Sequence, residues 1–174
     1  MKMIDRGAVL ARYVEDAPPL RVKELIRELG IEIETKRLRD NESAHIRFDF
    51  DEGKYVIAVD EDHHVNRKNF SMAHELGHFF LHRGFINDEP LQRQDYYAHL
   101  SDEERAREIE ANQFAANLLV SNGALKKFLA DKCSVTLAEL SDAFEVSQVV
   151  MKIRLRSFRT HNPISYNKIS NPEG

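Results

Sequence analysis

The sequence predicts an α+β fold in which a small antiparallel sheet precedes a long helix and a helical module follows. Three observations support this fold. Two short stretches rich in β-branched and aromatic residues flank a turn, an HExxH string lies within a helical pattern, and two short helical patterns stand near the C-terminus. No internal repeat or low-complexity segment interrupts this order.

Two helices are expected before the sheet, over residues 4–14 and 19–29. Pro18-Pro19 separates them, and Gly30 stands where a glycine commonly ends a helix. Neither stretch is long or apolar enough for a secretory leader, and no span of the sequence approaches about 20 apolar residues. We therefore expect a cytoplasmic protein that does not associate with membranes.

The sheet is expected to contain three strands. Ile31, Ile33 and Thr35 alternate with polar residues, and residues 44–50 and 54–59 flank an Asp-Glu-Gly turn that is typical of a hairpin. A small antiparallel sheet would then lie directly before the HExxH helix. The edge of such a sheet could hold an extended peptide by backbone hydrogen bonds.

The HExxH string is His74-Glu75-Leu76-Gly77-His78. On a helix, His74 and His78 lie on one face about 6 Å apart, so both imidazoles can reach one zinc ion at about 2.0–2.1 Å. Glu75 is rotated by about 100° and is placed to accept a proton from the attacking water. The string predicts a zinc site with its own general base.

The surrounding residues favour this interpretation. Apolar residues recur with helical spacing at positions 72, 73, 76, 79 and 80, and Ser71 is the expected N-cap. Gly77 within a helix costs about 1 kcal/mol relative to alanine, which indicates close approach by another backbone or by a substrate. His82 continues the series of histidines but would lie about 12 Å from His74 along the axis, so we expect it to be a supporting, capping or surface residue.

A catalytic zinc usually has three protein ligands, and a second helical pattern over residues 108–120 supplies a candidate for the third. Glu108 and Asn112 share one stripe with small and apolar residues, where both polar groups need partners. Glu108 is the expected ligand, with Glu110 as the alternative. Asn112, one turn later, could accept the free ring N–H of a ligating histidine. The preceding Ser101 and its acidic neighbours resemble a helix cap.

The stretch between the two helical patterns, residues 82–101, shows no clear periodicity and has the length of a binding loop or lid. Hydrolysis of a peptide needs a donor for the oxyanion besides the metal. Tyr96, Tyr97 and His99 are the candidate donors in this loop.

Residues 134–158 contain two short helical patterns, 136–143 and 147–157, that resemble a helix-turn-helix. This module favours an alternative function, a DNA-binding transcriptional regulator whose zinc site is regulatory or inactive. Its charge is balanced and the whole chain carries a net charge of −4, which disfavours direct DNA binding. We expect the apolar residues Val149, Val150, Ile153 and Leu155 to pack inside the protein.

Taken together, residues 67–82 (RKNFSMAHELGHFFLH), 108–120 (EIEANQFAANLLV) and 134–155 resemble the ImmA/IrrE family of metallopeptidases. The family commonly follows its Leu-Leu pair with Met-Pro, where this chain has Val120-Ser121. Ser121 or Asn122 can cap the next helix instead, so the difference leaves the expected ligands unchanged.

The resemblance implies one zinc ion per chain bound by His74, His78 and Glu108, with Glu75 as the general base. The resemblance covers roughly residues 45–158. We expect a zincin-like metallopeptidase domain over residues 1–120, with the N-terminal helices and the small sheet, and a helical module with a tail over residues 121–174. The expected substrate is a helix-turn-helix repressor or antitoxin, usually encoded nearby, whose cleavage relieves transcriptional repression under stress.

Overall fold

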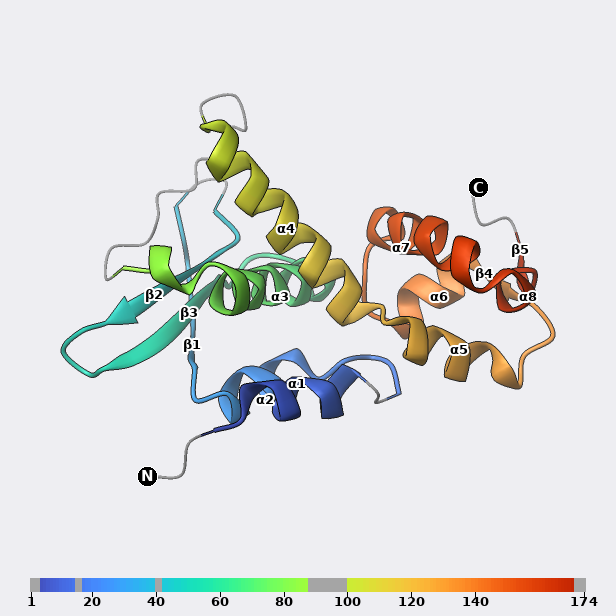
Figure 1. The fold of residues 1–174 in the computed structure, drawn as a ribbon, viewed down its shortest axis with the longest axis horizontal. Helices are drawn as coiled ribbons and strands as arrows, with labels where there is room; N and C mark the ends of the chain where they lie inside the picture. The colour runs from blue at the N-terminus through green and yellow to red at the C-terminus, as the bar shows by residue number, and fades with distance from the viewer. Residues whose placement is uncertain (1–3, 15–16, 40–41, 88–99, 171–174) are drawn as a thin grey trace.

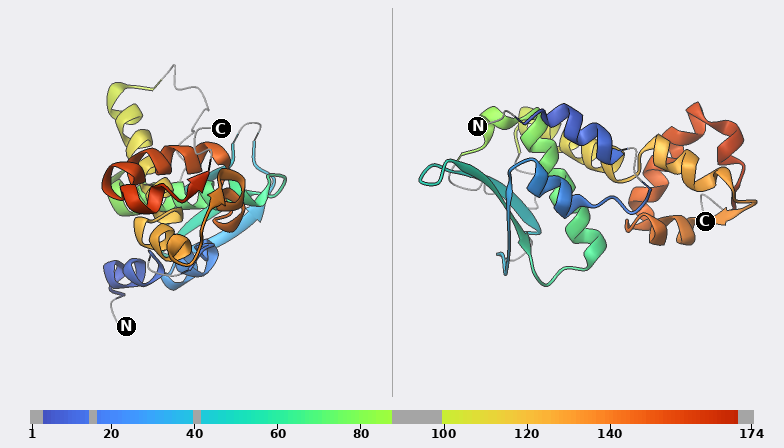
Figure 2. Two further views of the ribbon diagram at one scale, coloured as in Figure 1. Left: turned by 90° about the vertical axis from the view of Figure 1, so that its right-hand side faces the viewer. Right: turned by 90° about the horizontal axis from the view of Figure 1, so that it is seen from below.

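The computed structural model describes residues 4–14, 17–39, 42–87 and 100–170 (Figure 1). Helix α4 runs from the part that contains the sheet to a group of helices at the other end, and the two views of Figure 2 show the same grouping. The elements follow in the order α1 (Arg6–Val14), α2 (Val22–Glu28), β1 (Glu32–Lys36), β2 (Ala44–Asp49), β3 (Lys54–Asp60), α3 (Val65–Leu81), a short 3-10 helix η1 (Arg83–Phe85), α4 (Asp102–Leu119), α5 (Asn122–Ala130), β4 (Val135–Thr136), α6 (Leu137–Ala143), α7 (Gln148–His161), α8 (Pro163–Tyr166) and β5 (Ile169–Ser170).

The two N-terminal helices are confirmed as α1 and α2. Gly30 follows α2 with φ of 76°, a conformation that glycine adopts without steric cost. The apolar faces of both helices join the core through Val9, Tyr13 and Leu25. Among the described residues, no helix combines the length and the apolar character that a bilayer crossing requires.

The sheet is mixed, so the predicted antiparallel sheet is wrong for one strand. The hairpin of β2 and β3 is confirmed, with Gly53 in its turn at φ of 64°. β1, however, pairs in parallel with the other edge of β3, which gives the order β1-β3-β2. Alternating apolar residues specify which face of a strand is buried but not the direction of its neighbour, so the parallel pairing could not be read from the sequence.

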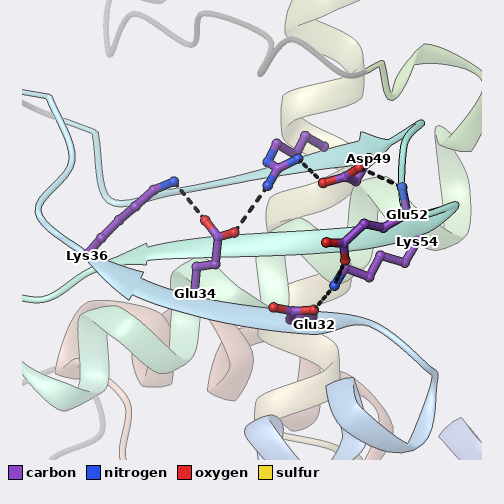
Figure 3. A network of polar contacts seen from close by, with 7 residues as sticks. Glu32, Glu34, Lys36, Asp49, Glu52 and Lys54 are labelled. Carbon is purple, nitrogen blue, oxygen red and sulfur yellow. Dashed lines mark hydrogen bonds and ion pairs between the residues drawn. The ribbon is translucent and has the colours of Figure 1, made fainter.

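The two faces of the sheet differ in character. Ile33, Ile46 and Ile57 belong to the face that packs into the core. The other face carries a network of polar contacts that spans all three strands and consists of two groups of ion pairs joined by a hydrogen bond from the Glu52 backbone to Asp49 (Figure 3). Its members are Glu32, Glu34, Lys36, Arg47, Asp49, Glu52 and Lys54. The sheet therefore supports α3 with one face only.

Helix α3 carries the HExxH string, as predicted, but begins at Val65, six residues before the expected N-cap Ser71. The side chain of His64 accepts a hydrogen bond from the Asn66 backbone N–H at 3.2 Å and caps the helix. Ser71 instead lies buried within the helix. A serine that precedes an apolar run can equally belong to the first turns of a longer helix, which explains the error.

Helices α6 and α7 occupy the two predicted helical stretches of the C-terminal module. Met151, Leu155 and Phe158 form the buried stripe of α7. Val149 and Ile153 are 67% and 56% exposed, so the expectation that they pack inside is wrong. They lie on the side of the helix opposite the buried stripe, because residues 151, 155 and 158 already fill the core-facing positions.

The C-terminal helices are attached to α3 by polar contacts. Asn66 donates to the Val146 carbonyl at 3.3 Å, and Asn69 donates to the Glu145 carboxylate at 3.0 Å. The connection between α6 and α7 therefore lies against the first turns of the same helix that carries His74.

Candidate metal centre

Helices α3 and α4 approach each other very closely beside the HExxH string. A Cβ atom placed on Gly77 would lie 2.9 Å from the Ala111 Cα and 3.1 Å from its carbonyl oxygen. The close approach expected for this glycine is therefore made by the backbone of α4. Because Glu108 precedes Ala111 by one turn, the contact holds its side chain beside the histidines of α3.

His74, His78 and Glu108 converge at this crossing, with donor atoms that all lie within 4.8 Å of one another. The two Nε2 atoms are 3.0 Å apart. The Glu108 carboxylate lies 3.1 Å from the Nε2 atom of His74 and 3.3 Å from that of His78. The structure thus brings together the three residues expected to bind the metal.

The donor set fits zinc. Tetrahedral zinc with bonds of about 2.0–2.2 Å places neighbouring ligand atoms about 3.3–3.6 Å apart, so the two Nε2 atoms, 3.0 Å apart, need to separate by only a few tenths of an ångström. Each of them already has an oxygen of the Glu108 carboxylate at 3.1–3.3 Å. Two imidazole nitrogens and one carboxylate are a ligand set used by catalytic zinc sites, which keep a fourth position for water or substrate. All three side chains are largely shielded from solvent, with exposures of 5–19%.

The second ring nitrogen of His74 faces Asn112, the residue expected to fix its tautomer. The His74 Nδ1 and Asn112 Oδ1 atoms are 2.9 Å apart. If the amide oxygen accepts the Nδ1–H, the neutral ring keeps a lone pair on Nε2, directed toward His78 and Glu108. The arrangement presents His74 in the form that a metal requires.

Glu75 follows His74 on α3 and is only 2% exposed. A carboxylate that is shielded in this way from bulk water and stands next to His74 in the chain is suited to proton transfer at the site. Its position on the helix is the one that the sequence predicts for the general base.

The N-terminus of α4, which presents Glu108, is strongly capped. Ser101 and Glu104 form a reciprocal capping box, as the sequence indicates. Hydrogen bonds from the backbone and hydroxyl of Ser101 hold the pKa of the Glu104 carboxyl below its usual value. The cap fixes the start of the helix two turns before Glu108.

The resemblance seen in the sequence is confirmed by a family model, Peptidase_M78, described as the IrrE N-terminal-like domain, which matches residues 26–156. The chain belongs to this family. The match includes the whole His74, His78 and Glu108 cluster and most of the C-terminal helices. The name of this family implies a peptidase, and the family also includes regulators.

Among solved structures, the chain is similar in fold to a Mycobacterium tuberculosis transcriptional regulator, with a TM-score of 0.54 and 20% sequence identity. The similarity covers 86% of this chain but 46% of the regulator, so the chain spans about half of that protein's length. No curated protein matches the sequence significantly.

The remaining predicted site residues fall into two groups. The oxyanion candidates Tyr96, Tyr97 and His99 lie outside the described residues. Glu110, the alternative ligand, does not join the cluster but contacts His82. His82 is buried between Glu110 and His78, a position that the repeat of histidines every four residues could have indicated.

Proposed function

We propose that this chain is a zinc-dependent endopeptidase that cleaves a helix-turn-helix repressor or antitoxin in the cytoplasm and so relieves transcriptional repression under stress. The observation that carries the proposal is the convergence of His74, His78 and Glu108 where α3 crosses α4. Membership in the IrrE N-terminal-like family supports a peptidase activity at this site. The class of substrate is supported by the family resemblance alone.

The residues at the site have two roles in this proposal, metal binding and proton transfer. His74, His78 and Glu108 would hold one zinc ion, which supplies Lewis acidity by acidifying a water molecule and polarising the scissile carbonyl. The Glu75 carboxylate takes the proton from the attacking water and later delivers it to the leaving amine. Burial of Glu75 keeps this proton from exchanging with bulk solvent during the reaction.

Metal analysis tests the ligand assignment. We expect one zinc per chain in the wild type and loss of zinc from His74→Ala, His78→Ala and Glu108→Ala, because two remaining ligands bind too weakly. His161→Ala is the matched control, since His161 is exposed on α7. Full zinc content in the three variants would exclude this site.

Cleavage of the helix-turn-helix protein encoded beside this chain tests the mechanism. Glu75→Gln should retain zinc and lose cleavage by at least about 10²-fold, because the amide cannot accept the proton. A Glu75→Gln variant that still cuts at the wild-type rate would rule out Glu75 as the base. Absence of cleavage by the zinc-loaded wild type would point to another substrate or to a different function.

A second candidate function is transcriptional regulation by direct DNA binding through α7. Val149 and Ile153 are exposed on this helix, and its sequence contains Lys152 and Arg156 but no acidic residue. Such a surface can contact a DNA groove, although the balanced charge of the module weakens electrostatic attraction. A gel-shift assay with random duplex at low salt separates the two candidates, since tight, salt-sensitive binding would favour the regulator.

A further inference from the structure

His82 lies at the end of α3, one turn after His78, and is 7% exposed. Its ring stands between two other polar groups. The His82 Nδ1 atom lies 3.2 Å from the His78 Nδ1 atom, and its Nε2 atom lies 2.9 Å from a Glu110 carboxylate oxygen. Both nitrogens of this buried ring are therefore engaged.

These contacts are compatible with one assignment of protons when His78 binds a metal. A ligating Nε2 atom carries no proton, so the proton of the neutral His78 ring is on Nδ1. The Nδ1–H then donates to His82, whose Nδ1 must be the unprotonated nitrogen. The proton of His82 is consequently on Nε2, where it faces the acceptor Glu110.

We propose that His82 and Glu110 are positioning residues that hold His78 in its metal-binding tautomer and direct its Nε2 atom toward Glu108. This inference rests on the proposed function, because it assumes that zinc binds at His78. Hydrogen bonds from ligating histidines to a second group fix the ring and raise the basicity of the ligand. Here the second group is another histidine, which is itself bonded to a carboxylate.

The two ligating histidines are supported in different ways. His74 faces the neutral amide of Asn112, whereas His78 faces a ring whose far side contacts the negative charge of Glu110. All three supporting contacts are made by residues of α3, its C-cap and α4, and the close packing of the two helices at Gly77 holds them in place. The negative charge of Glu110, which acts through His82, should make the Nε2 atom of His78 a stronger metal ligand than that of His74.

Zinc affinity, measured by competition with a chromophoric chelator, tests the proposal on the full chain. His82→Leu removes the acceptor for the His78 Nδ1–H and should weaken zinc binding by about 10–100-fold. His82→Asn places an amide oxygen near the position of the lost Nδ1 atom, so it should recover most of the affinity. Equal losses in the two variants would show that His82 acts only through packing and would overturn the proposal.

Glu110→Gln tests whether the carboxylate contributes to zinc binding. This variant can still be measured if His82→Leu fails to fold. It should weaken zinc binding several-fold in the wild-type background but have no effect in the His82→Asn background, because the contact is already lost there. Glu103→Gln removes the same charge from an exposed position on α4 and is the control. Equal effects of Glu110→Gln in both backgrounds would contradict a relay through His82.

Imidazole nitrogen spectra of the zinc-loaded wild type give a direct readout of the tautomers. We expect the proton of His78 on Nδ1 and that of His82 on Nε2; a His82 proton on Nδ1 would overturn the assignment. Failure of the wild type to bind zinc would reject the proposed function itself. Zinc binding that is unchanged in folded His82→Leu would reject only the positioning role.

Discussion

Gly77 shows how a single residue without a side chain sets the geometry of the candidate metal centre. The nearest atoms to its missing Cβ belong to the backbone of Ala111, which cannot move without displacing α4. Glu108 lies one turn before this contact. A change at Gly77 should therefore alter both the packing of the helices and the distance from Glu108 to the two histidines.

We expect Gly77→Ala to lower the free energy of unfolding by about 1–3 kcal/mol, as overpacking in a core usually does, and to weaken zinc binding. Thermal denaturation and zinc competition measure the two effects. Gly123→Ala is the control, because its Cβ would meet nothing closer than 3.9 Å and alanine favours the helix. Wild-type stability in Gly77→Ala would mean that the two helices separate at little cost.

At the scale of secondary-structure elements, Arg154 attaches α7 to the junction of α4 and α5. Its guanidinium donates to the Val120 carbonyl and to the Asn122 side chain, each at 2.9 Å. Burial lowers the pKa of Arg154, which reflects the cost of placing this charge away from water. The side chain satisfies a carbonyl where one helix ends and the next begins.

Arg154→Met should reduce the free energy of unfolding by about 1–3 kcal/mol, because the Val120 carbonyl is left buried without its donor. For a chain of this length the melting temperature should fall by about 2–12 °C. Arg156→Met, exposed on the same helix, should leave the melting temperature nearly unchanged. Equal melting temperatures for the two variants would show that the buried contacts contribute nothing.

The end of β3 provides a prediction on pH. The Asp60 carboxylate accepts backbone hydrogen bonds from Leu38 and Asp62, each at 2.8 Å, and these bonds lower its pKa. A carboxyl whose pKa is lower in the folded state stabilises the fold above about pH 4. This stabilisation is lost as the pH falls through the folded pKa.

Asp60→Asn should therefore melt below the wild type at pH 7, and the difference should shrink as the pH falls below about 4. Thermal melts between pH 3 and 7 measure this trend. Asp51→Asn, exposed in the hairpin turn, is the control and should show no such trend. A difference that stays constant over the range would mean that the charge of Asp60 is unimportant.

At the scale of the whole molecule, the candidate metal centre joins α3 to α4, and α4 leads into the C-terminal helices. A ligand that binds only the folded state stabilises it by about 2.7 kcal/mol at one hundred times its dissociation constant. We therefore expect zinc to raise the melting temperature by about 5–11 °C and a chelator to reverse the change. Glu108→Ala should show no zinc-dependent shift, whereas a shift equal to that of the wild type would place the metal elsewhere.

The parts of the molecule that the sequence predicts well depend on short-range geometry. The placement of His74, Glu75 and His78 on one helix follows from the helical repeat, and the hairpin of β2 and β3 follows from its turn. The Ser101 cap of α4 is likewise recognisable from four consecutive residues. Local rules suffice in each case, because the interacting groups are close along the chain.

The sequence by itself determined where most of the helices lie, the hairpin, the family resemblance and the HExxH residues of the candidate site. Only the tertiary structure decided that β1 runs parallel to β3, that Glu108 and not Glu110 joins the histidines, and that Glu110 contacts His82 instead. Each of these depends on how segments about 20 or more residues apart pack together. Helical and strand periodicity specifies which side of an element is buried, whereas its partner and relative position depend on close packing, such as that between Gly77 and Ala111.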